Sequence, residues 1–119
     1  MSMRRTDLGE TYEVYTGTTK ELEATIINPD SGNAQDLSDT NVYTTGIAII
    51  YKPDGTQIGG NMAISFDTPR STGITFFTVL ATHSHILNAG NWIGLIQFFN
   101  VGGDIIDQQV FNINIKETR

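Results

Sequence analysis

The sequence predicts an all-β protein, specifically an immunoglobulin-like (Ig-like) β-sandwich of about seven to eight antiparallel strands. Apolar residues alternate or form continuous runs over segments of roughly 5 to 10 residues, and turn-forming residues separate these segments. No window of about 12 residues shows the 3.6-residue period of an amphipathic helix. The 119 residues suffice for one domain that needs no disulfide or metal to fold. A jelly roll of similar strand count is the alternative fold.

An extended N-terminal arm is expected to precede the sandwich. Residues 1–10 show no strand-like alternation, so they are assigned to the arm, and the Ig-like sandwich domain is expected to span residues 11–119. The arm contains Arg4 and Arg5, which form the only basic cluster of the sequence. We expect these two side chains to meet acidic groups of a neighbouring protein or to remain solvated.

Alternation and apolar runs place the strands in chain order. They are expected at residues 11–16, 20–27, 42–52, 62–66, 74–80, 93–99 and in a last run that ends at residue 116. Residues 47–51 are apolar on both faces, as in a central strand. Residues 81–91 are the least strand-like and are assigned to a helical turn that crosses between the sheets.

Turn chemistry separates these strands, and the apolar positions predict the core. Residues 28–33 and 52–56 combine proline with glycine, asparagine or aspartate, which favour tight turns. Residues 100–104 form a glycine-rich turn between the two closing strands. Leu37 is expected to close one end of the core. The other expected core residues are Leu22, Ile26, Ile49, Phe76, Ile96, Phe98, Phe111 and Ile113.

Composition narrows the classes of function. The formal net charge is −6, and an acidic surface repels phosphate, so no nucleic-acid partner is expected. The absence of cysteine excludes a disulfide scaffold and a thiolate metal site. The sequence has no apolar run of about 18 residues, so no membrane-spanning helix is expected. No apolar segment follows Arg5, so no signal peptide is expected.

Two clusters have residue types that bind metals. If the chain is extended, His83 and His85 point to one side, as two metal ligands would. However, no acidic residue nearby completes such a site, so packing or surface roles are favoured. Four oxygen donors suited to calcium lie between residues 30 and 39, at Asp30, Asn33, Asp36 and Asp39. Their spacing does not match an EF-hand, and we expect them to cap turns.

Neither catalysis nor sugar binding has a clear sequence signature. Glu13, Glu21 and Glu23 alternate on strands and are expected to be solvated rather than to form a glycosidase pair. No nucleophile elbow, P-loop or dinucleotide fingerprint occurs, so no catalytic residue and no cofactor is predicted. Trp92 is expected to plug the core, with a subunit interface as one alternative. The other alternative is a sugar-stacking platform shared with one of four tyrosines, Tyr12, Tyr15, Tyr43 and Tyr51.

Six short motifs occur in a fixed order between residues 18 and 116. They are Asp36-Leu37-Ser38, Lys52-Pro53-Asp54-Gly55, Gly73-Ile74-Thr75-Phe76, Gly90-Asn91-Trp92, Gly102-Gly103-Asp104 and Phe111-Asn112-Ile113-Asn114-Ile115. This order resembles the Ig-like module of tailed-bacteriophage structural proteins, including the N-terminal domain of the upper-baseplate family. The chain departs from that family in length, because the family continues into further domains.

The resemblance implies a non-enzymatic structural subunit of a tailed-phage virion, assembled in the cytoplasm of the host bacterium. It would be a tail, neck or baseplate component, or a head decoration protein. Its expected partners are copies of itself, in a homo-oligomer, and other virion proteins. A charged fraction of 17% is consistent with a surface that contacts other subunits. The expected interface residues are Arg4, Arg5, Leu8 and Tyr12. A carbohydrate-binding or adhesion module is the alternative function.

Overall fold

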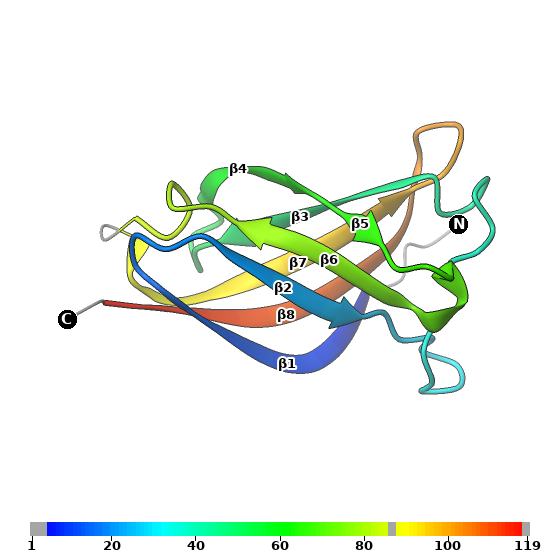
Figure 1. Cartoon of the computed structure of the whole chain (residues 1–119), viewed down its shortest axis with the longest axis horizontal. Helices are drawn as coiled ribbons and strands as arrows, with labels where there is room; N and C mark the ends of the chain where they lie inside the picture. The colour runs from blue at the N-terminus through cyan, green and yellow to red at the C-terminus, as the bar shows by residue number, and fades with distance from the viewer. Residues whose placement is uncertain (1–4, 86–87, 118–119) are drawn as a thin grey trace.

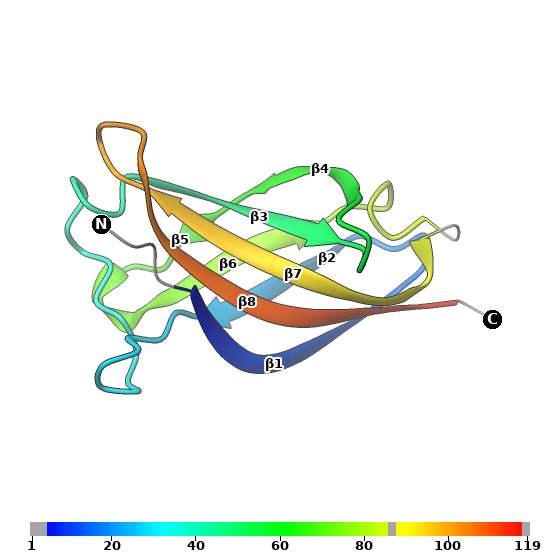
Figure 2. The same ribbon diagram turned by 180° about the vertical axis from the view of Figure 1, so that it is seen from behind.

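Two stacked sheets form the β-sandwich that the sequence predicts (Figures 1 and 2). The computed structural model describes residues 5–85 and 88–117. The larger sheet has the strand order β1-β8-β7-β3-β4, and the smaller sheet has the order β2-β6-β5. The strands are β1 (Arg5–Tyr15), β2 (Lys20–Thr25), β3 (Thr45–Tyr51), β4 (Gln57–Ala63), β5 (Ser65–Phe66), β6 (Ile74–Val79), β7 (Gly90–Phe99) and β8 (Ile105–Lys116). A short 3-10 helix, η1 (Arg70–Thr72), lies between β5 and β6.

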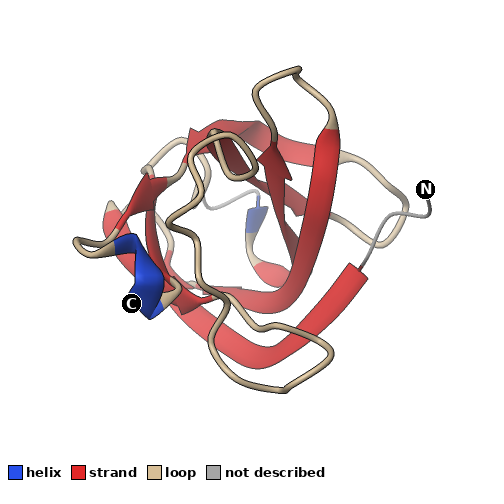
Figure 3. Cartoon of the chain, turned by 90° about the vertical axis from the view of Figure 1, so that its right-hand side faces the viewer, coloured by secondary structure: helices blue, strands red, loops and turns tan. Residues whose placement is uncertain are grey.

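The core lies between the two sheets and follows the period-two pattern of each strand. In β2, Leu22 and Ala24 are buried while their neighbours are exposed. Seen end-on, the larger sheet curves around the smaller one (Figure 3). The largest fully buried side chains are Phe77, Phe98 and Phe111, with Leu37 and several isoleucines and valines around them. Tyr12 packs edge-on against Phe111, with ring centroids 5.3 Å apart.

The expected arm boundary at residue 10 is wrong, because Arg5–Tyr15 is one strand at the edge of the larger sheet. This strand pairs in parallel with β8, so the strands are not all antiparallel as expected. The register shifts between Asp7 and Thr11, where Gly9 has a φ of 69° and its N–H donates to the Asp7 Oδ1. This bulge interrupts the alternation that a sequence pattern relies on. Arg4 lies outside the described residues.

Two positions in the predicted core are wrong. Phe76 faces away from the smaller sheet's inner side, whereas Phe77 is buried opposite Leu22. Both faces of β6 contain large apolar residues, so the pattern alone does not choose between them. Ile49 is buried, but it lies on the outer face of the larger sheet and outside the core cluster. The buried face of β6 instead includes Thr75, whose hydroxyl donates to the Ala24 carbonyl.

The crossing before β7 contains a turn and a partly buried tryptophan. The backbone N–H groups of His83 and Ser84 both donate to the Leu80 carbonyl, which forms the turn expected in this segment. Trp92 packs against the core from β7, and its indole N–H donates to the Asn88 carbonyl at 2.6 Å. The Lys52 ammonium lies 5.6 Å from the centre of the Trp92 ring. Trp92 is therefore partly buried against the core and has a polar partner for its indole N–H.

Candidate functional site: the outer face of the larger sheet

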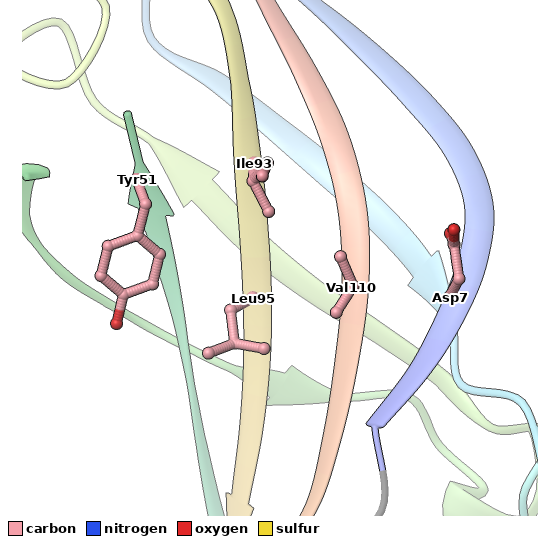
Figure 4. Close-up of a pocket in the computed structure, with 5 residues that line it drawn as sticks. All are labelled: Asp7, Tyr51, Ile93, Leu95 and Val110. Atoms are coloured by element: carbon pink, nitrogen blue, oxygen red, sulfur yellow. The ribbon is translucent and has the colours of Figure 1, made fainter. Parts of the chain in front are cut away.

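The outer face of the larger sheet is apolar across its three central strands, β3, β7 and β8. Strand pairing places Ile49 beside Leu95, and Leu95 beside Val110. It places Tyr51 beside Ile93 in the next row. We call this surface the apolar face and define it by six residues, Ile47, Ile49, Tyr51, Ile93, Leu95 and Val110. Figure 4 shows four of these side chains on the same side of adjacent strands.

The apolar face is hollowed rather than flat. A depression of about 370 Å³ is lined by Asp7, Tyr51, Ile93, Leu95 and Val110 (Figure 4). Leu95 is only 5% exposed although it does not belong to the core between the sheets, because neighbouring side chains cover it. Ile93 is 45% exposed. The face therefore combines a buried apolar side chain, Leu95, with an exposed one, Ile93.

The polar residues around the apolar face are mostly uncharged. Along the outer sides of β3, β7 and β8, the one charged side chain is Lys116 at the end of β8, which forms an ion pair with Glu13 at 2.9 Å. Asp7 on β1 is the acidic group at the edge of the depression. The other polar side chains on the outer sides of β7 and β8 are amides, at Asn91, Gln97, Gln108, Asn112 and Asn114. This arrangement suits the burial of apolar area against a protein. The described residues on the outer sides of β3, β7 and β8 place no general acid beside a general base.

A second, smaller groove lies where β1 and β2 face each other across the open side of the sandwich. It has a volume of about 270 Å³ and is lined by Leu8, Glu10, Tyr12, Glu23, Thr25 and Ile27. The Tyr12 hydroxyl donates to the Glu23 carbonyl at 2.8 Å. Burial, followed by the negative charges of Glu10 and Glu23, raises the pKa of Tyr12 to about 12. The tyrosine therefore remains neutral and closes the groove towards the core.

The structure brings together two of the four residues that the sequence predicted at an interface. Leu8 and Tyr12 both line the groove and pack against the core from β1. Arg5 pairs through its backbone with Gln108, and Arg4 lies outside the described residues. Leu8 and Tyr12 thus have a structural role within the chain, and their part in an interface stays a prediction.

The two histidines do not form the pair of ligands on one side that an extended chain would give. His83 is 3% exposed, whereas His85 is exposed. The His83 Nδ1 accepts from the Leu80 N–H at 3.1 Å, and its Nε2 lies 2.9 Å from the Gly60 carbonyl oxygen. A neutral ring with its proton on Nε2 satisfies both partners. His83 is therefore a packing residue that joins β4 to the turn after β6.

The acidic loop between residues 30 and 39 is built from turns in which side chains accept backbone hydrogen bonds. Asp36 Oδ1 accepts from both the N–H and the hydroxyl of Ser38, and these bonds hold the pKa of Asp36 below its usual value. Asp39 Oδ1 accepts from the Asn41 N–H at 3.0 Å. Within residues 5–85 and 88–117, no group of three His, Asp or Glu side chains is placed to hold a metal ion. Turn capping, as predicted, explains Asp36 and Asp39, and for Asp30 and Asn33 it stays a prediction.

The remaining candidates are three glutamates and the aromatic residues. Glu13, Glu21 and Glu23 are exposed on β1 and β2. The alternative of a sugar-stacking platform is not favoured, because Tyr12, Tyr43 and Trp92 all pack against the core. Tyr51 lies on the apolar face, and Tyr15 is 52% exposed on β1.

The sequence has a signal for the apolar face, but the same signal also fits a strand that is covered on both sides. Residues 47–51 and residues 93–99 are apolar on both faces of their strands. A central strand covered on both sides has this pattern, and so does a strand whose outer face binds a partner. The topology separates the two cases, since among the described residues no second layer covers the outer side of β3 and β7 (Figure 2).

Comparison with known proteins gives a similarity in fold. No family model matches this sequence, and no curated protein matches it. A solved structure described as the N-terminal domain of phage TP901-1 ORF48 is similar to this chain, with a TM-score of 0.63 and 11% sequence identity. The match covers 94% of this chain and 94% of that domain. In the described part of the chain, no helix is long and apolar enough to cross a membrane. The fold of this chain is therefore that of a phage protein domain.

Proposed function

We propose that this chain is a non-enzymatic structural subunit of a tailed-phage virion and that it works by binding other virion proteins. The single observation that carries this proposal is the match to the ORF48 N-terminal domain, which extends over nearly the whole length of both chains. The motif order in the sequence supports the same context independently. Its Lys52-Pro53-Asp54-Gly55 motif forms the β3–β4 turn, and Gly102-Gly103-Asp104 forms part of the β7–β8 turn.

The surface chemistry supports binding over catalysis. The larger hollow is lined mainly by aliphatic and aromatic side chains, and its one carboxylate, Asp7, lies on β1, with β7 and β8 between it and Tyr51 on β3. An apolar depression with a mainly uncharged polar rim is typical of a protein–protein contact. We assign this contact to the virion, in the tail, neck or baseplate in preference to the head, with assembly in the host cytoplasm.

The test is to stop translation of the gene in a phage that encodes this chain. An early amber codon is expected to yield defective particles in a non-suppressing host, and the wild-type gene on a plasmid should restore them. Mass spectrometry of purified wild-type particles should detect the chain at a constant number of copies. Infectious particles of normal composition in the absence of the chain would refute the proposal.

A carbohydrate-binding role makes a different prediction in the same system. Defective particles would then be complete in structure and would fail only to adsorb to cells. Electron microscopy of amber-mutant particles separates the two functions, because a structural subunit is required for assembly whereas a glycan-binding module is required for attachment.

A further inference from the structure

We propose that the apolar face is a self-association surface, which pairs with the same face of a second copy of this chain about a two-fold axis. The inference names the partner of the surface described above, and its biological setting rests on the proposed function. The contact itself is a property of the isolated chain and can be measured on the purified protein.

The apolar face is larger than the fold requires. The core between the sheets is formed by inner-face side chains, and neither Ile49 nor Leu95 belongs to it. A solvent-facing side of an antiparallel sheet normally has polar residues at alternate positions. Here Tyr51, Ile93 and Val110 extend the apolar surface around Ile49 and Leu95. Exposed apolar surface of this kind marks an interaction site.

The distribution of charge favours a partner surface with few charged groups. The chain has a formal net charge of −6, but the outer sides of β3, β7 and β8 contain only Lys116, which Glu13 already neutralises. A charged partner residue buried against this face would lose its hydration without gaining an opposite charge. A second copy presents a face of this kind, in which Asp7 at the edge of the depression is the acidic group.

The polar rim is chemically self-complementary. Gln97, Gln108, Asn112 and Asn114 each contain a donor and an acceptor in one side chain. When a two-fold axis brings such a rim against itself, amides can pair with amides in either orientation. Carboxylates or ammonium groups in these places would instead meet groups of the same charge. A rim made of amides is therefore suited to an isologous contact.

The shape of the face is also self-complementary. Ile93 stands out with 45% of its side chain exposed, and it lies at the edge of the depression floored by Leu95 and Val110 (Figure 4). In an isologous pair, each copy contributes the same knob and the same hollow. We place the Ile93 side chain of each copy in the depression of the other.

The size of the face predicts a weak contact. Three strands about 4.8 Å apart and about eight residues long, at about 3.3 Å each, cover about 400 Å². A standard interface covers about 800 Å² on each partner. A pair in dilute solution should therefore dissociate in roughly the 10 µM to 1 mM range, and repetition of the contact in a particle would strengthen it.

Sedimentation equilibrium of the purified full chain between about 10 µM and 1 mM tests the pairing. Ile93→Glu places a charge in the contact and should weaken association at least about tenfold. Leu80→Glu is the matched control, because Leu80 is 48% exposed at the end of β6 and lies away from the apolar face. It should leave association unchanged. Circular dichroism confirms that both variants are folded.

Crosslinking locates the contact, since the chain has no cysteine of its own. Asn112→Cys on the rim should give a dimer with a short bis-maleimide, whereas Thr25→Cys, exposed on β2 of the other sheet, should not. A wild-type chain that remains monomeric at 1 mM overturns the proposal, as does equal weakening by both glutamate variants. A monomer that is still found in virions overturns this inference alone, and it would show that another virion protein covers the face.

Discussion

The carboxamide of Gln109 forms two hydrogen bonds with the backbone of Ile27 and thereby joins the two sheets. Its Oε1 accepts from the Ile27 N–H, and its Nε2 donates to the Ile27 carbonyl, both at 3.3 Å. Gln109 is completely buried on β8, and Ile27 follows β2 of the smaller sheet. The same Nε2 lies 3.3 Å from both carboxylate oxygens of Asp107. The buried carboxamide of Gln109 therefore has hydrogen-bond partners for both its oxygen and its nitrogen.

Replacement of Gln109 by leucine should destabilise the fold. The substitution leaves the Ile27 N–H and carbonyl without their partner, and we expect the free energy of unfolding to fall by about 1–3 kcal/mol. Urea denaturation of dilute protein measures this change. Gln108→Leu, one residue away on the outer side of β8, is the control and should change stability by less than about 0.5 kcal/mol. Equal effects of the two substitutions would contradict the role assigned to Gln109.

Gly59 and Gly60 provide a matched pair of alanine substitutions on β4. Gly59 has a φ of +65°, and a Cβ there would lie 2.3 Å from the His83 Cδ2. Gly59→Ala should therefore cost about 2–4 kcal/mol through backbone strain and displacement of the buried ring. At Gly60 nothing lies within 4 Å of an added Cβ, so Gly60→Ala should be nearly neutral. Thermal unfolding of the two variants gives the comparison, and a stable Gly59→Ala protein would show that His83 is not held as described.

Deletion of residues 2–10 should destabilise the domain rather than remove a separate arm. The deletion takes away the half of β1 that pairs with residues 108–110 of β8, together with the buried part of Leu8. We expect a loss of about 2 kcal/mol or more in the free energy of unfolding. Deletion of residues 2–4 leaves β1 intact and serves as the control. Denaturant curves that coincide for the shorter and longer deletions would contradict the importance of this half of β1.

Tyr12 should lose its proton at a higher pH than an ordinary tyrosine. This difference should make the stability of the fold depend on pH in the alkaline range. Its pKa in the folded protein is about 12, above the ordinary value of 10.0, because burial and the charges of Glu10 and Glu23 disfavour the phenolate. The unfolded chain therefore loses the Tyr12 proton first, and the stabilisation is complete below about pH 10 and disappears as the pH rises to about 12. Absorbance of the phenolate, compared between the wild type and Tyr12→Phe, follows this group. A Tyr12 titration at the ordinary pKa would show that the groove is open to water.

The sequence was sufficient to predict the sandwich because alternation and turn chemistry are local properties. The β2 and β8 patterns and the β3–β4 and β7–β8 turns all appear in the structure. The alternation predicts strand β1 only over residues 11–16, because the bulge at Gly9 breaks the pattern. The choice between Phe76 and Phe77 depends on the register of β6 against β2, which is a tertiary property.

The candidate site was less predictable than the fold for the same reason. An apolar run such as residues 47–51 indicates burial on both faces, but it does not say whether this chain or another covers the outer one. Only the strand order shows that Ile49, Leu95 and Val110 lie side by side on an outer surface. The sequence pattern instead favours an interface at the N-terminus, because Arg4 and Arg5 form its basic cluster.

Incorporation of two variants into particles tests most directly whether the apolar face is the assembly surface of a virion subunit. The phage would be grown with Ile93→Glu or Leu80→Glu as its only source of this chain, and the chain would be quantified in purified particles by mass spectrometry. We expect wild-type copy number with Leu80→Glu and a loss of at least about tenfold with Ile93→Glu. Equal copy numbers of the two variants in infectious particles would contradict the assignment.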